Sequence, residues 1–269
     1  EVYGLNKPII PGFIGWAGNA ITGDFGESWH YGVPVTEKFN DVIGISLVVN
    51  TITLLVQVLI SIPLGILAAR KQYSPTDYAV TVFALMGISL PTFFLATILK
   101  YVFAIKLGWF PLYGLTGRFH TTMTPFVQLL DKGYHMVLPI ITLTMLSVGG
   151  LMRYTRTNML EVLNSDYIRT ARAKGLPEKV VINKHAFRNT LIPLVTTMSG
   201  ILPSMFTGSQ ITETMFQIPG IGYISYQAII RGDIPFAMFY LTFILVLTQA
   251  SLLVADIMYA VVDPRIRVN

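Results

Sequence analysis

The sequence has 269 residues, of which 53% are hydrophobic and only 12% are charged, whereas about 25% of the residues in an ordinary soluble domain are charged. This composition predicts a membrane protein. The chain has no cysteine, which excludes disulfides, thiolate metal sites and cysteine nucleophiles. The basic residues behind its formal net charge of +5 are dispersed over several loops, so we expect no nucleic-acid partner.

Five apolar runs are long enough to cross a bilayer, which takes about 20 residues per helix. They cover residues 42–69, 79–99, 134–152, 190–212 and 234–262. The second run contains Pro91 and is followed by Lys100, whose ammonium group we expect to reach the lipid–water interface. Residues 1–41 mix glycine, proline and aromatic residues, which is typical of a loop-rich segment on one membrane face. The predicted fold is an all-α, polytopic helical membrane protein with a transmembrane domain at 42–262.

The distribution of basic residues predicts the orientation. Twelve of the 19 lysine and arginine residues fall in the loops 70–78 and 153–189 and in the tail 263–269. Because loops on the cytoplasmic side carry an excess of lysine and arginine, we expect these three segments in the cytoplasm. Residues 1–41 are then extracytoplasmic and the C-terminus is cytoplasmic.

The long polar loop 153–189 carries a helical pattern. Ser165 or Asp166 is suited to cap a helix over residues 167–174, which Gly175 stops before Pro177 starts another. On that helix Tyr167, Ile168 and Ala171 share one face, while Arg169 and Arg172 share another. We expect the apolar face to insert into a groove on a partner, with the arginines meeting acidic groups beside it.

Several motifs now point to a family. Residues 166–175 read Asp-Tyr-Ile-Arg-Thr-Ala-Arg-Ala-Lys-Gly, and residues 185–193 read His-Ala-Phe-Arg-Asn-Thr-Leu-Ile-Pro. Further motifs are Gly23-Asp-Phe-Gly26, Thr155-Arg156, Glu213-Thr-Met-Phe216, Pro219-Gly-Ile-Gly222 and Asp263-Pro-Arg-Ile-Arg267. Together they resemble the ABC importer permeases of the oligopeptide, dipeptide and nickel subfamily, and above all the first permease subunit of oligopeptide systems. The Glu-Ala-Ala of the broader family is replaced here by Arg169-Thr170-Ala171, as in that subfamily.

The resemblance implies a type I ABC importer permease fold in the bacterial cytoplasmic membrane, with six spans, of which the first would precede Glu1. It implies a second homologous permease subunit, two cytoplasmic ATPase subunits and an extracytoplasmic peptide-binding protein as partners. ATP and Mg would be bound by the ATPase subunits, and this chain would bind no cofactor. The coupling helix that docks on an ATPase subunit would consist of Asp166, Tyr167, Ile168, Arg169, Thr170, Ala171, Arg172, Ala173, Lys174 and Gly175.

The resemblance also implies a docking place for the binding protein. Residues 213–233 are rich in glycine and proline, and we expect them to form a loop at the outer mouth of the permease. The docking residues would be Glu213, Pro219, Gly220 and Gly222.

The residues themselves predict no covalent chemistry. The sequence has no Gly-x-x-x-x-Gly-Lys-Ser/Thr loop to hold phosphates, so a partner must handle ATP and the chain is not expected to be an enzyme. We find no catalytic nucleophile and base together. The histidines have no metal-ligand spacing, so no metal site is expected; they are His30, His120, His135 and His185.

One acid, Asp256, lies inside a predicted span. An intramembrane carboxylate can serve ion coupling, but pairing with Arg153 or Arg156 at the cytoplasmic end is the favoured interpretation. Three alternatives stay open at this point. The loop 153–189 could be a plain basic connector, the protein could import a dipeptide, nickel or another small solute, or it could be an ion-coupled secondary transporter.

Overall fold

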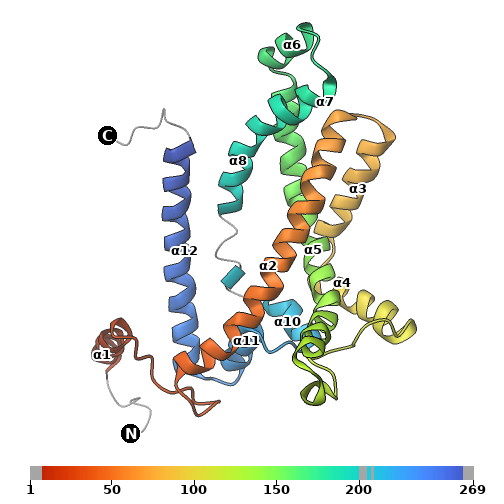
Figure 1. The fold of residues 1–269 in the computed structure, drawn as a ribbon. Helices are drawn as coiled ribbons and strands as arrows, with labels where there is room; N and C mark the ends of the chain where they lie inside the picture. Colours follow the sequence, from red (N-terminus) through yellow and green to blue (C-terminus); the bar gives the residue numbers. More distant parts are fainter. Residues whose placement is uncertain (1–7, 200–204, 207–208, 263–269) are drawn as a thin grey trace.

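The computed structural model describes residues 8–199, 205–206 and 209–262, and over these residues the chain is almost entirely helical (Figure 1). Three long helices dominate: α2 (Val35–Arg70), α5 (Pro125–Leu163) and α12 (Ile234–Val262). Each is long and apolar enough to cross a membrane, and together they contain the predicted spans 42–69, 134–152 and 234–262.

Helix α2 starts at Val35, directly after Pro34, and therefore includes residues assigned from the sequence to the loop-rich segment 1–41. The start of an uncharged run and the start of a helix need not coincide. The first turns of α2 carry Glu37 and Asp41, so the helix extends beyond its uncharged stretch. An uncharged run marks the part of a helix that suits lipid, and it does not mark where the helix begins.

The second predicted span is bent. Helix α3 (Pro75–Ser89) is followed by α4 (Thr92–Leu99) and the π-helix η1 (Lys100–Lys106), and the two halves are inclined at 106°. Leu90 is extended, with φ −86° and ψ 131°, because the proline ring of Pro91 disfavours the helical conformation in the residue before it. The predicted span 79–99 is therefore broken at Pro91, the proline that the sequence placed inside it.

Lys100 makes a contact that the sequence did not predict. Its Nζ donates a hydrogen bond of 2.6 Å to the carbonyl oxygen of Met215 and lies 5.5 Å from the centre of the Phe216 ring. The ammonium group therefore joins η1 to α10 (Gln210–Phe216).

The number of spans can be compared only in part. Within the residues that the structure describes, three helices could cross a membrane, or four if the bent pair is one span. The predicted span 190–212 begins in α8 (Phe187–Ser199), but much of its remainder lies outside the described residues, as does the tail 263–269.

Helices α2, α3 and α5 pack closely as one group (Figure 1). Two glycines permit this contact. A Cβ atom at Gly87 would lie 2.1 Å from the carbonyl oxygen of Met145, and one at Gly149 would lie 2.3 Å from that of Ala84. Any larger residue would separate α3 from α5, as expected for small residues at membrane helix contacts.

The two ends of this group carry the shorter elements (Figure 1). At one end are α6 (Asp166–Ala173), α7 (Glu178–Val180) and the π-helix η3 (Val181–Ala186). At the other are α1 (Ile9–Ile21), the 3₁₀ turn η2 (His120–Thr122), α10, and α11 (Ile221–Ile230). The segment 213–233, expected as a loop, is therefore largely helical.

Candidate functional site

The segment after α5 forms the predicted helix. Helix α6 begins at Asp166 and ends at Ala173, and Gly175 follows with a φ of +74°. That left-handed conformation suits glycine, which lacks a Cβ. The hydroxyl of Ser165 does not cap α6; it donates instead to the carbonyl oxygen of Val162 at 2.6 Å. The helix and its glycine stop were thus predictable, whereas the side-chain cap was not.

The apolar face of α6 is buried within this chain. Ile168 is fully buried and Ala171 is nearly so. They belong to one core cluster whose other buried members, on α2, α5 and η3, are Ala69, Met159, Val181, Ile182 and Ala186. The expectation that this face inserts into a groove on a partner was therefore wrong, since the groove is made by the ends of α2 and α5 and by η3. Tyr167 remains half exposed, and its hydroxyl oxygen accepts from Nδ2 of Asn189 at 3.1 Å.

The remaining side of α6 faces outward. Arg169 lies 3.5 Å from Asp166, and both side chains are largely exposed. The exposed residues of the segment are Asp166, Tyr167, Arg169, Thr170, Arg172, Ala173, Lys174 and Gly175. This surface is polar, and the buried apolar face on the other side of α6 holds the helix in place. The surface is therefore suited to bind a partner repeatedly without unfolding.

Arg172 already has an acidic partner in the chain. Its guanidinium makes two hydrogen bonds to the carboxylate of Glu178, at 2.8 and 3.2 Å. This hydrogen-bonded pair lowers the pKa of the Glu178 carboxyl below its usual value and ties the end of α6 to α7. Beside it is a recess of about 320 Å³ bounded by Ala69, Arg70, Gln72, Leu160, Leu163, Asn164, Arg172, Glu178 and Ile182.

A buried ion pair lies one helical turn along α5 from Met159. Nε and Nη2 of Arg156 each donate to the carboxylate of Asp77 on α3, both at 2.8 Å. The carboxylate also accepts from the backbone N–H of Tyr73 at 3.0 Å. Arg156, one of two arginines expected to pair with Asp256, is therefore bound to Asp77. The side chain of Asp256 itself lies outside the described residues.

At the opposite end Glu213 is a buried internal acceptor. It is 1% exposed and accepts from the Ser46 hydroxyl at 2.7 Å and from the backbone N–H groups of Ser209 and Tyr223 at 3.1 and 3.0 Å. Its carboxylate thus joins α2, α10 and the N-terminus of α11. This burial speaks against the expected role of Glu213 in docking a binding protein.

The glycines of the same motif serve this close contact. Gly220 and Gly222 are buried, while Pro219 is partly exposed. A Cβ atom at Gly220 would lie 2.4 Å from the Ser46 hydroxyl oxygen and 2.5 Å from a carboxylate oxygen of Glu213. Three of the four predicted docking residues therefore form an internal joint, and only Pro219 keeps part of its surface free.

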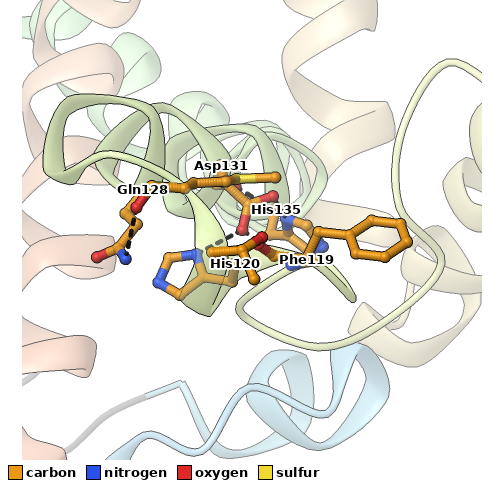
Figure 2. Close-up of polar contacts among 8 residues, drawn as sticks. Phe119, His120, Gln128, Asp131 and His135 are labelled. Carbon is orange, nitrogen blue, oxygen red and sulfur yellow. Dashed lines mark hydrogen bonds and ion pairs between the residues drawn. The ribbon is translucent and has the colours of Figure 1, made fainter.

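The side chains of His120 and His135 both lie close to the carboxylate of Asp131, near η2 (Figure 2). Asp131 on α5 lies 2.7 Å from Nδ1 of His120 and 3.4 Å from Nδ1 of His135. It also accepts from the backbone N–H of Gly117 at 2.9 Å, so it fixes the loop before α5. Among the described residues, no three histidine, aspartate or glutamate side chains are arranged as metal ligands.

Known structures share this fold. The chain is similar to a permease chain of the MetNI methionine ABC transporter, solved in inward-facing conformations, with a TM-score of 0.64 and 16% identity. The match covers 85% of this chain and 97% of that one. The likeness confirms the predicted all-α permease fold.

Sequence relatives extend over the whole chain. The oligopeptide transport system permease protein AppB of Bacillus subtilis (strain 168) is 40% identical over 267 residues, which are 99% of this chain and 83% of AppB. The oligopeptide transport system permease protein OppB of Haemophilus influenzae is 34% identical over 269 residues, which cover 98% of this chain and 83% of OppB. The family profile described as "Binding-protein-dependent transport system inner membrane component" matches residues 61–268. This chain therefore belongs to that family of multi-pass inner-membrane permeases.

Proposed function

We propose that this chain is a permease subunit of an ATP-driven ABC importer and forms, with a second homologous permease subunit, the pathway for oligopeptides. Transport follows by alternating access, an exchange between two packings of the helices. The observation that carries the proposal is the construction of α6, a short helix at one end of the bundle whose buried face rests on α2, α5 and η3. The named oligopeptide permeases that match nearly the full chain support the substrate class.

In this proposal the movement of an ATPase subunit acts on the exposed surface of α6. Two cytoplasmic ATPase subunits bind ATP and Mg, and one of them contacts the exposed residues between Asp166 and Gly175. The buried face of α6 passes the displacement to Met159 on α5 and Ala69 on α2. The permease carries out no covalent chemistry, because hydrolysis belongs to its partners.

The orientation belongs to the same proposal. The basic loop 153–189 and the tail 263–269 lie in the cytoplasm, which the excess of lysine and arginine supports. Residues 1–41 and the α10–α11 end then lie outside, where a peptide-binding protein delivers its ligand. Since Glu213, Gly220 and Gly222 are buried, we assign them to the internal joint, and the docking surface must use exposed residues around them.

Uptake by the purified complex in proteoliposomes tests this function. Radiolabelled oligopeptide should accumulate when the binding protein and ATP are supplied, and not when a pH gradient replaces ATP. Dipeptide and nickel, offered under identical conditions, test the two nearest alternatives. Uptake driven by the gradient without nucleotide would contradict an ABC importer and favour an ion-coupled secondary transporter.

A further inference from the structure

Helix α1 is apolar, and yet none of its side chains is fully buried. It spans 13 residues, Ile9–Ile21, and contains no acidic or basic residue and no buried one. Five of its six large side chains, all but Trp16, are between 58% and 90% exposed; they are Ile9, Ile10, Phe13, Ile14 and Ile21. A contiguous apolar surface of this kind in water marks a site of interaction with a protein or a membrane.

The residues of α1 divide into three sectors around its axis. Gly12, Trp16 and Ala20 follow a spacing of four and are half-buried, so they form the side toward the rest of the chain. At 3.6 residues per turn, the exposed side chains of Ile10, Phe13, Ile14 and Ile21 fall within an arc of about 100° beside that side. The half-buried Ala17 lies within the same arc, and Ile9, exposed at the start of the helix, lies on the first side. The third sector holds only small or polar residues, namely Pro11, Gly15, Gly18 and Asn19.

Aromatic contacts fix the level of α1 along the bundle. The Trp16 ring lies 6.3 Å from that of Phe25, which in turn lies 4.6 Å from that of Phe239. Phe239 is in the second turn of α12, which begins at Ile234. Figure 1 shows α1 beside this end of α12, viewed nearly along its own axis while α12 stands upright. Helix α1 therefore lies across the direction of the span, at the level where the span begins.

The helical state of α1 itself requires an apolar surrounding. Helices of this length are marginal in water even when rich in alanine, and Gly12, Gly15 and Gly18 lower the helix propensity further. Packing against described residues compensates only in part, because no residue of α1 is fully buried and its main contact is that of the half-buried Trp16 with Phe25. An apolar medium favours the helix because it leaves no water to bond to open backbone groups.

We propose that α1 is an interfacial helix that lies in the lipid leaflet at the α10–α11 end, with Ile10, Phe13, Ile14 and Ile21 among the acyl chains. In the proposed orientation this is the outer leaflet. Helix α12 also carries exposed apolar side chains near this end, since Leu241 and Leu245 are each 60% exposed. A binding protein that docks and leaves in each cycle would uncover this surface to water, whereas phospholipid covers it permanently. The helix thus anchors the segment that leads into α2.

Single-cysteine labelling tests this placement, since the chain has no native cysteine. Nitroxide labels are placed at Phe13→Cys and Ile14→Cys in the apolar sector and at Gly15→Cys and Gly18→Cys in the small-residue sector. The control sites tolerate a side chain, because a Cβ atom at either glycine meets nothing within 4 Å. The full transporter is reconstituted in phospholipid nanodiscs, and collision rates with oxygen and with a water-soluble nickel chelate are measured.

The ratio of oxygen to nickel collisions should be severalfold higher at positions 13 and 14 than at 15 and 18. A spin-labelled phospholipid and an Arg118→Cys label in the exposed loop give the lipid and water standards. Two results would overturn the proposal: water-like ratios at all four positions, or low collision rates with both reagents at 13 and 14, which would show a protein cover. The measurement does not depend on transport, so it stands apart from the test of the importer function.

Discussion

Buried carboxylates hold distant segments of this chain together. Asp77, Glu213 and Asp233 are each no more than 3% exposed, and burial of a charge costs free energy unless hydrogen bonds satisfy it. Asp233 meets this condition by accepting from the backbone N–H groups of Trp29 and His30 at 3.1 and 3.2 Å. The sequence motif identified Glu213 as important but could not show that its partner Ser46 lies 167 residues away.

Glu213→Gln should destabilise the complex while leaving its shape nearly unchanged. The carboxylate accepts from three donors, and an amide NH₂ would oppose at least one of them, at a cost of about 1–3 kcal/mol. The melting temperature of the purified complex measures this effect. Glu37→Gln, at an exposed position on α2, is the control, and equal melting temperatures for both variants would contradict the buried role.

The Arg172–Glu178 pair predicts a pH dependence confined to acid. Its hydrogen bonds lower the pKa of the Glu178 carboxyl below its ordinary 4.5, so the stabilisation is fully present above that value and is lost as the pH falls through the lowered pKa. Because both side chains are about half exposed, the contribution is small, about 0.5 kcal/mol. Below pH 4.5 the difference in stability between wild type and Glu178→Gln should shrink, and a constant difference down to pH 3 would contradict it.

At the scale of single elements, the sequence predicted those features that depend only on residues close together in the chain. Helix α6 and its stop at Gly175 followed from spacing and turn residues. Pro91 was visible in the sequence as an X-Pro signal, but hydropathy does not show how sharply the span 79–99 bends there. The burial of Ile168 could not be predicted, because a helical wheel shows that a face is apolar without showing which surface covers it.

Gly175→Pro should uncouple the transporter. Proline holds φ near −65°, whereas Gly175 has a φ of +74°, so the chain after α6 must take another path. We expect ATP hydrolysis to continue while peptide uptake falls at least tenfold, about 1.4 kcal/mol of lost coupling. Gly175→Asn is the matched control, because asparagine tolerates the left-handed conformation. Equal uptake per ATP in the two variants would refute the assignment of α6.

The Asp77–Arg156 pair should behave as one unit that joins α3 to α5. Removing Arg156 leaves the buried carboxylate of Asp77 unpaired, which costs up to about 3–5 kcal/mol, whereas removing Asp77 costs less because the Arg156 side chain is partly exposed. We therefore expect Asp77→Asn and Arg156→Gln each to lower the stability of the complex, and the double variant to lose clearly less than the sum of both. Asp166→Asn, at a fully exposed carboxylate, controls for charge alone. Strictly additive losses would show that the pair is not coupled.

At the scale of the whole molecule, composition and apolar runs predicted the membrane class and five spans, of which three lie in the long helices α2, α5 and α12. Hydropathy could not resolve the α10–α11 end, because glycine and proline in 213–233 suggested a loop where α10 and α11 pack around Glu213. Those glycines are needed for close contact and not for turns alone. Motif resemblance supplied the permease fold, which the full-length relatives and the TM-score of 0.64 confirm.

The central claim, that α6 is the contact with an ATPase subunit, is tested most directly by photo-crosslinking. A benzophenone label is attached at Thr170→Cys, on the exposed side of α6, in the otherwise cysteine-free chain of the assembled complex. Arg118→Cys in the opposite loop is the control. The account predicts a covalent adduct with a nucleotide-binding subunit from position 170 and none from 118. Absence of that adduct at 170, or the same adduct from 118, would contradict it.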